Sequence, residues 1–564
     1  MVYSIEESWY GGRHPLTFSE HQQQISRHKH LLKEYREQTK ADFDKLRVEA
    51  EALDEDDIFS EENIKKALEF SKHVFEASKN CSKNFINLSK AVLISSIEQF
   101  KKMNIEAPCH FAAIALGSVA KGEATPYSDL EYAFVVERHS EYFFELAVDS
   151  YFQIGNVGET PLKCFDINEL EMGFTPNAQN MVSGYKIDGI TEWAGNMPTG
   201  NGKVNGQSLT FTVDELIEFC KKEAESPVQE LADKSDMLSS TVVIYTNEEG
   251  ETSKLHEEFR RRRIEYEQTR AAHIEEVGNK RRDSFAQDIK KYTFLPDFVR
   301  FQPPKNLDLQ IKYDIFRYPT LLANNVKVCL AWNISYPWKI FLNLHKEDFL
   351  SLENYQYISI VLALSIYLRT SSYLSQQSQT LSVSLYSHAA DHSTQLHQLP
   401  INLFIILGYL VTPIKQSIQS SLNSNANASL HHFVRCMFKD IAVNNSNYLL
   451  KAEVYYFAGR YRDALYELTK EIDDQIEWTP CSEFLSKISV HFPQITSAQK
   501  YVELCCYLLY YTENYLFASD YIGWVIEQQE HDVGLWKLLA AHCSTEIDDY
   551  KTARQLLTEV RTMF

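Results

Sequence analysis

The feature of this sequence that most restricts its fold is a pair of short apolar runs joined by a polar connection. The first run is Phe111–Leu116 and the second is Leu130–Val136. Both have the length of a β-strand, and the turn formers Gly117-Ser118, Gly122 and Pro126 lie between them. We therefore expect strand, turn and strand here, with the Gly117-Ser118 corner forming a turn and not a helix.

Most of the remaining sequence favours helix. Residues 18–54 are polar and charged and contain no Gly or Pro, which predicts one long solvated helix. A second helix is expected to start near Ser60, which is followed by two acids suited to a first turn, and a third at about Phe85–Met103. Helical spacing returns at Ser140–Phe152. The predicted fold class is α+β and mostly helical, with several domains and a small mixed sheet.

The C-terminal part shows a tetratricopeptide-like pattern, in which a small residue, a Tyr, a turn Gly, a Tyr, an Ala and a large apolar residue follow at fixed spacing. The first copy has these residues at Ala452, Tyr455, Gly459, Tyr461, Ala464 and Leu468. Two weaker copies have Cys506, Leu509, Tyr515, Ala518 and Ile522, and then Ala541, Tyr550, Ala553 and Leu557. We expect stacked helical hairpins. A plain hairpin stack without a peptide groove would give nearly the same pattern.

Charge and cysteine usage narrow the class of protein. The chain has 56 Lys and Arg against 77 Asp and Glu, a formal net charge of −21, which argues against binding nucleic acid through its phosphates. The basic run Arg260–Arg263 lies among nearly as many acids and is interpreted as a solvated helix face. The 10 Cys include no CxxC pair, which is typical of reduced thiols and predicts a cytoplasmic protein.

Two further patterns bear on membranes and export. The N-terminus shows no basic region followed by an apolar core, so no signal peptide is expected. No uninterrupted apolar run reaches the ~18 residues of a membrane span. The strongest candidate, Tyr357–Tyr367, is shorter and is expected to be a buried helix.

The connection between the two predicted strands carries residues suited to phosphate and metal chemistry. Gly117 has no side chain, so a phosphate can approach its backbone, and the Ser118 hydroxyl can donate a hydrogen bond to phosphate oxygens. Lys121, followed by Gly122 in the turn, is a candidate counter-charge for a polyphosphate. Asp129 and Glu131 lie two residues apart on a strand, so their side chains point to one face. Two such carboxylates suit one or two Mg²⁺ ions beside a triphosphate.

These residues resemble the active site of the polymerase β-like nucleotidyltransferase superfamily, which has Gly-Ser, a gap, and then Asp-x-Asp or Asp-x-Glu. The string GSVAKGEATPYSDLEYAF is similar to the DUF294-type putative nucleotidyltransferases and to the N-terminal domain of the bacterial protein-PII uridylyltransferases. Residues 184–202 resemble a second block of those relatives, and residues 307–323 the start of the helical domain that follows the catalytic one. Some of these relatives carry tetratricopeptide repeats.

The resemblance implies a role for each matching residue. Gly117 and Ser118 match the phosphate-contacting pair, Asp129 and Glu131 match the metal-binding acids, and Lys121 stands where relatives often have Arg or Lys. A third carboxylate that helps to deprotonate the attacking hydroxyl has no fixed motif here. Our first choice is Asp188, in GYKIDG, and our second is Asp166, in KCFDI. Glu131 departs from the commoner Asp and has a longer side chain.

Together these patterns predict a metal-dependent nucleotidyltransferase that uses Mg²⁺ or Mn²⁺. It would transfer a nucleoside monophosphate from an NTP to an acceptor hydroxyl, on a protein recruited by the repeats. The alternative is a catalytically inactive scaffold of the same fold that acts by binding proteins. The expected domains are an N-terminal helical segment at 1–104, a nucleotidyltransferase-like domain at 105–250, a helical domain at 251–440 and tetratricopeptide-like repeats at 441–564.

Overall fold

A computed structural model describes most of the chain, which divides into two compact units. The described residues are 15–53, 60–158, 210–225, 238, 240–250, 252–272, 283, 285–287, 308–377, 383–384, 401–424, 430–439, 441, 448–457, 460–470, 495–528 and 533–563. Unit 1 comprises residues 1–294, 309–383 and 411–441, and unit 2 comprises residues 295–308, 384–410 and 442–564.

A small mixed sheet forms the centre of the N-terminal half of unit 1. Its strands are β1 (Phe111–Ala115), β2 (Tyr132–Val136), β3 (Thr210–Phe211) and β4 (Val242–Thr246), in the spatial order β3-β2-β1-β4. β1 is antiparallel to β2 and β4, and β3 is parallel to β2. Every residue of β1 and β2 is buried, because helices cover both faces, and this explains why both strands are continuous apolar runs.

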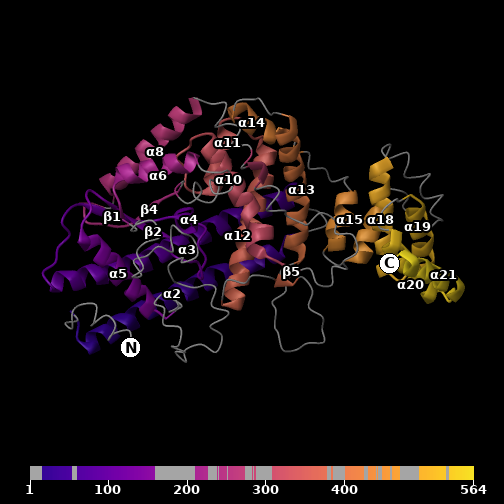
Figure 1. Ribbon diagram of the computed structural model, residues 1–564, viewed down its shortest axis with the longest axis horizontal. Helices are drawn as coiled ribbons and strands as arrows, with labels where there is room; N and C mark the ends of the chain where they lie inside the picture. The colour runs from indigo at the N-terminus through magenta and orange to yellow at the C-terminus, as the bar shows by residue number, and fades with distance from the viewer. Residues whose placement is uncertain are drawn as a thin grey trace. The chain divides into compact units, whose positions relative to one another are not determined.

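Alternate residues of the strands enter two different cores. Phe111, Ala113 and Ala115 pack with α3 (Glu61–Lys102) and α5 (Glu141–Asn156) on one face. Ala112 and Ile114 pack with α6 (Val213–Glu225) and α8 (Lys254–Ala272) on the other. Figure 1 shows these two helix pairs on opposite sides of the strands. The two-residue period of a strand thus separates the cores.

The other elements of unit 1 are helical except for two short strands. They are α2 (Phe18–Glu51), α4 (Gly117–Ala120), β5 (Asp308–Leu309), the π-helix η3 (Ile311–Phe316), α10 (Arg317–Cys329), α11 (Pro337–Lys346), α12 (Leu352–Gln376), β6 (Val383–Ser384), α13 (Ile401–Ser424) and α14 (Leu430–Met437). The division between the units passes through β5, β6 and α13.

The N-terminal helices follow the predicted pattern with one correction. α2 is the expected long helix, and Thr17 caps it through a reciprocal hydrogen bond with Glu20. Ser60 caps α3 by accepting from the Asn63 amide. The two helices expected after Ser60 are, however, a single helix, because no Gly or Pro interrupts it. In the middle of this helix, the Ser78 and Ser82 hydroxyls form hydrogen bonds with the backbone of Gly122 and Ala124.

α12 is a buried core helix. Among the described helices of at least 18 residues, it is the one apolar enough to cross a membrane by length and composition, and 83% of that apolar window is buried inside the fold. The predicted buried run Tyr357–Tyr367 lies wholly within it. Ser351 caps its N-terminus, and Gln377, in a left-handed conformation, ends it.

The described residues of unit 2 include three helical hairpins. They are α15 (Tyr448–Phe457) with α16 (Tyr461–Lys470), α18 (Ile495–Tyr511) with α19 (Tyr515–Gln528), and α20 (Val533–Glu546) with α21 (Tyr550–Met563). Each described helix contacts the next along the chain, so the hairpins stack in sequence order. Figure 1 draws these helices in orange to yellow.

The three hairpins share one turn geometry. The residue before each second helix donates its backbone N–H to a carbonyl five residues earlier, Arg460 to Tyr455 at 2.9 Å, Asn514 to Leu509 at 2.8 Å and Asp549 to Ser544 at 2.8 Å. Three residues into each second helix stands a buried alanine, and the positions are Ala464, Ala518 and Ala553. The small side chains at these positions let the paired helices approach closely. The prediction of a mostly helical α+β protein with a small mixed sheet is confirmed.

Candidate functional site

The predicted glycine–serine corner lies at the end of β1. The strand ends at Ala115, and Gly117 follows with a φ of +55°, a left-handed backbone that favours glycine. The expectation of a turn without helix is wrong, because Gly117–Ala120 form one turn of α-helix, α4. The left-handed Gly117 begins this turn, so the chain still changes direction sharply at the glycine. The Glu123 amide donates to the Ser118 carbonyl at 2.9 Å and closes the loop that follows.

The two predicted metal-binding acids come directly before β2, and not within it. Asp129 and Glu131 flank Leu130, and β2 begins at Tyr132. The Leu116 amide donates to the Glu131 carbonyl at 2.9 Å, which extends the β1–β2 pairing by one step. Both acids are partly buried.

The Glu131 carboxylate lies against the α-carbon of Gly117. A Cβ added to Gly117 would overlap the Oε2 atom of Glu131. Two independent features therefore favour glycine at this position: the left-handed backbone and the neighbouring carboxylate, which leaves no room for a Cβ. The corner and one acid, which are separated in sequence, are in direct contact.

Lys312, a basic residue that sequence reasoning missed, lies near this acid pair, and two arginines lie near Lys312. Lys312 lies in the π-helix η3, and Arg317 begins α10. Burial lowers the pKa of Lys312 to about 8, and the charges of Arg317 and Arg369 add to this effect, whereas Asp129 and Glu131 raise its pKa. Both acids thus act electrostatically on one ammonium group. A cation held near two carboxylates reduces their mutual repulsion.

Arg369 joins the site from the buried helix α12. Its guanidinium lies 4.0 Å from the centre of the Phe316 ring, and its Nη1 donates to the Glu123 carbonyl at 3.3 Å. It is 4% exposed. Arg369 is the one basic residue of α12, and it directly follows the apolar run Tyr357–Leu368. Sequence reasoning could have used this signal, because a buried charge needs nearby partners.

The loop between the corner and the acids is held by α3. The Ser78 hydroxyl donates to the Gly122 carbonyl at 2.7 Å, the Cys81 thiol donates to the Ala124 carbonyl at 3.1 Å, and the Ala124 amide donates to the Ser82 hydroxyl at 3.0 Å. These three side chains come from residues 78–82 of α3. They fix the loop backbone, which positions the corner relative to the acids.

α2 holds the second half of this loop. The Arg36 Nε donates to the Pro126 carbonyl at 3.2 Å, and its guanidinium lies 4.3 Å from the centre of the Tyr127 ring. Within the loop, the Thr125 amide donates to the Ser128 hydroxyl at 2.8 Å. Residues 121–128 are all buried, so the acids follow a rigid connection.

Two of the predicted nucleotide-binding residues are placed inside this packing. Lys121 is 6% exposed. A Cβ on Gly122, whose φ is +72°, would lie 2.7 Å from the Tyr336 ring and 3.0 Å from Trp338. The Tyr336, Trp338 and Phe75 rings form a stack with successive centroids 5.0 Å apart. The ring contact explains why position 122 is glycine. Ser118, in contrast, is partly exposed.

The third carboxylate remains a prediction. Asp188 and Asp166 lie outside the described residues. Within the part of the chain that the structure describes, no group of three or more His, Cys, Asp or Glu side chains is arranged to hold a metal ion. Two carboxylates are nonetheless compatible with Mg²⁺, which binds hard oxygen ligands and commonly takes one or two carboxylates together with substrate phosphates.

Comparisons with known proteins add no family assignment. No protein-family model matches this chain, and no curated protein matches it.

Proposed function

We propose that this chain is a nucleotidyltransferase that transfers a nucleoside monophosphate from an NTP to a hydroxyl group of a protein. The observation that supports the proposal most directly is the contact between Gly117 and the Glu131 carboxylate, with Asp129 nearby in sequence and Lys312 under the influence of both acids. It unites the glycine corner, an acid pair and a basic group, which are the parts that phosphoryl transfer needs.

Each residue has a defined task in this proposal. Asp129 and Glu131 would hold Mg²⁺ or Mn²⁺, which when bound neutralises charge on the triphosphate. The Ser118 hydroxyl donates a hydrogen bond to a phosphate oxygen. Lys312 and Arg317 offset the acids in the free chain, and they attract the triphosphate when it binds.

The reaction is an in-line displacement at the α-phosphorus. The acceptor oxygen forms a bond to this phosphorus, the bond between the α-phosphorus and the bridging oxygen to the β-phosphate breaks, and pyrophosphate leaves. The hydroxyl proton passes to a general base, for which Asp188 and then Asp166 are the proposed candidates. Most of the rate enhancement in such a site comes from positioning and electrostatic stabilisation.

The hairpins of unit 2 are proposed to recruit the protein that is modified. Their shared turn geometry and buried alanines support a tetratricopeptide-like stack. Several large side chains on this unit are exposed, including Tyr466 at 61% and Leu516 at 65%. Exposed aromatic and aliphatic side chains on a repeat stack suit a protein partner.

A scaffold without catalysis is the second candidate. It is favoured by the large exposed side chains on the hairpins, such as Tyr466 and Leu516, which suit protein binding without chemistry at the acid pair. In this case the acid pair and the basic residues would act as a structural ion cluster, and the hairpins would provide the function through protein binding.

Incubation with each α-labelled nucleotide and Mg²⁺ or Mn²⁺ in a lysate distinguishes the two functions. The enzyme predicts a labelled protein band that Asp129→Ala abolishes while the melting temperature is kept. Pyrophosphate release provides an independent readout. If no nucleotide gives label or pyrophosphate, and partner binding is the same in Asp129→Ala, the scaffold is correct.

A further inference from the structure

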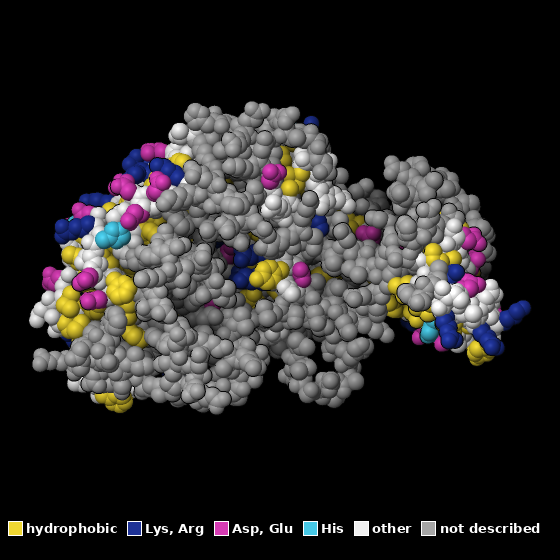
Figure 2. Space-filling view, viewed as in Figure 1, with side chains coloured by type: hydrophobic (Ala, Val, Ile, Leu, Met, Phe, Trp, Pro, Cys, Tyr) yellow, Lys and Arg dark blue, Asp and Glu magenta, His cyan; other side chains and the backbone are white. Residues whose placement is uncertain are grey.

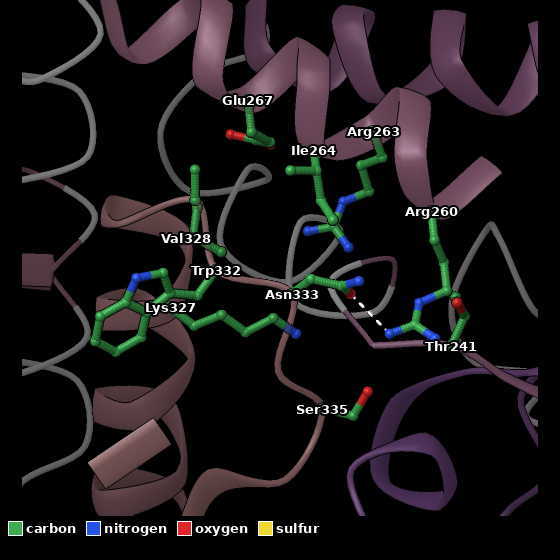
Figure 3. Close-up of a pocket in the computed structure, with 11 residues that line it drawn as sticks. Thr241, Arg260, Arg263, Ile264, Glu267, Lys327, Val328, Trp332, Asn333 and Ser335 are labelled. Carbon is green, nitrogen blue, oxygen red and sulfur yellow. Dashed lines mark hydrogen bonds between the residues drawn. The ribbon is translucent and has the colours of Figure 1, made fainter. Parts of the chain in front are cut away.

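A basic pocket lies on unit 1 between helix α8 and the end of α10. Arg260 and Arg263 enter it from α8, Lys327 enters from α10, and Trp332 and Asn333 line it from the segment that follows. In Figure 3 the three basic head groups converge on the space beside Asn333. The hollow measures about 420 Å³ with its open mouth included.

Each of these three cations donates a hydrogen bond to a neutral oxygen atom, and the Glu257 carboxylate also acts electrostatically on Arg260. The Nη2 atom of Arg260 donates to the Asn333 side-chain oxygen at 2.8 Å, which Figure 3 marks with a dashed line. The Arg263 guanidinium donates to the Leu238 carbonyl at 2.5 Å, and the Lys327 ammonium donates to the Ser240 hydroxyl at 2.8 Å. Neutral oxygens orient a cation without cancelling its charge. Of the acids, Glu267 lines the pocket.

The helical period divides the run of four arginines into two pairs. Arg260 and Arg263 are three residues apart and share one face of α8. Arg261 bonds to the Glu265 carboxylate at 2.6 Å, and Arg262 bonds to Asp214 at 2.7 Å. Figure 2 shows basic and acidic side chains mixed on the surface where Figure 1 draws α8. The predicted solvated face therefore holds for the middle arginines, while the outer two turn into the pocket.

The pairing of β1 with β4 places the pocket close to the glycine corner. Thr241 lines the pocket, and the next residue, Val242, pairs with Ala115 at the end of β1. Gly117 follows two residues later. The pocket and the candidate site therefore share one edge of the sheet, although they use different side chains.

We propose that this pocket binds the phosphate group of a small phosphorylated ligand. Two guanidinium groups and one ammonium group converge there in a chain whose net charge is −21. Guanidinium groups match phosphate oxygens in a forked geometry, and the ammonium adds a further point charge. The proposal stands whether or not the chain transfers nucleotides, because none of its residues belongs to the acid site.

Calorimetric titration of the full chain with inorganic phosphate, pyrophosphate and ATP, in a metal-free buffer, tests the proposal. Arg260→Gln and Arg263→Gln should each weaken the binding of the tightest probe about tenfold or more, since each removes a charge-assisted hydrogen bond. Arg261→Gln, which changes the same helix on its solvent side, should leave affinity within about twofold. Melting temperatures confirm that the variants fold. If Arg263→Gln does not fold, the affinity of Arg260→Gln alone tests the proposal.

The outcomes separate this pocket from the acid site. Binding that survives Asp129→Ala and is lost in the pocket variants supports the proposal. A preference for ATP over pyrophosphate identifies a nucleotide as the bearer of the phosphate, and the reverse identifies a free polyphosphate. The proposal is overturned if no probe binds, if Arg261→Gln weakens binding as much as the pocket variants, or if Asp129→Ala abolishes binding that Arg263→Gln retains.

Discussion

The carboxylate of Glu131 occupies the space that a side chain on Gly117 would need. This contact ties the end of β1 to the segment that leads into β2, and it also fixes the direction of one acid of the candidate site. Because Gly117 has a φ of +55° as well, the position is restricted by both its backbone and its neighbour.

Gly117→Ala should therefore destabilise unit 1 and abolish nucleotidyl transfer. The left-handed backbone and the displaced carboxylate together predict a loss of about 2–4 kcal/mol in the free energy of unfolding. Denaturant unfolding followed by circular dichroism measures it. Gly155→Ala is the matched control, because no atom lies within 4 Å of a Cβ there, and it should change stability by less than about 1 kcal/mol. Equal losses in the two variants would contradict the contact.

Substitutions around Lys312 should shift its pKa in opposite directions. Asp129→Asn and Glu131→Gln remove charges that raise this pKa, so they should move it below about 8, whereas Arg317→Gln should move it up. Competitive acylation over a range of pH, read by mass spectrometry, gives the apparent pKa, with the exposed Lys66 as a reactivity reference. The same direction of change in all three variants would mean that these groups do not surround Lys312.

Lys312 also predicts a pH dependence of ligand affinity and of stability. A bound triphosphate favours the charged ammonium, so affinity should fall as the pH rises through about 8. In the free chain the folded pKa lies below the ordinary value of 10.5, so the unfolded chain binds more protons between pH 8 and 10.5, and stability rises with pH there. Nucleotide titrations at several pH values check the first effect, and Lys312→Met should flatten the profile.

Two buried histidines predict acid lability of unit 1. Burial lowers the pKa of His28 and of His256 to about 4, while the Nε2 atom of each ring keeps a hydroxyl partner, Ser95 and Thr241 respectively. The folded pKa is below the unfolded value of 6.5, so stability is present above pH 6.5 and is lost as the pH falls toward 4. The loss is on the order of 3 kcal/mol per histidine. The urea concentration at the unfolding midpoint, measured at successive pH values, should fall less steeply with decreasing pH in His28→Gln than in the original chain.

Thiol reactivity should distinguish buried from accessible cysteines. Burial raises the pKa of Cys81 to about 11 and that of Cys543 to about 12, so both stay protonated at pH 8. Iodoacetamide at pH 8 should modify Cys109, Cys220 and Cys436, which are partly exposed, before these two. Because Cys81 donates to the Ala124 carbonyl, its early modification in a native sample would contradict the packing of α3 on the loop.

Truncation of the large apolar side chain at the equivalent position of each hairpin should cost different amounts of stability. Leu468 and Ile522 are fully buried, but Leu557, at the equivalent place in α21, is 49% exposed. Leu468→Ala and Ile522→Ala should each cost about 2–5 kcal/mol in unit 2, and Leu557→Ala less than about 1 kcal/mol. Thermal unfolding of the three variants measures the difference. A large loss in Leu557→Ala would indicate that another surface covers α21.

The sequence predicted the elements whose signal is local. The strands at 111–116 and 130–136 were recognisable because both of their faces are buried, and the helix start near Ser60 follows from a short-range capping hydrogen bond. α3 is a single helix where two were predicted, and the side chains of Ser78, Cys81 and Ser82 in its middle form hydrogen bonds with a loop that lies far along the chain. Local periodicity does not carry that information.

The candidate site was predicted only in part for the same reason. Gly117, Asp129 and Glu131 are close in sequence, so their spacing was informative. Lys312 comes near the acids from η3, and Arg317 and Arg369 act on Lys312 from α10 and α12. All three lie far from the acids in sequence, so their approach depends on tertiary packing. The contact between Gly122 and the Tyr336 ring likewise could be recognised only in the folded chain.

The hydrogen bonds from α3 to residues 122–124 have a consequence for how this protein can be divided or can diverge. A fragment that starts at β1 would keep every residue of the nucleotidyltransferase-like motif and still lose the hydroxyl and thiol groups that hold the loop in shape. We expect substitutions at Ser78, Cys81 and Ser82 to be tolerated only together with changes in that loop. A search for related proteins should therefore compare the first hundred residues as well as residues 117–131.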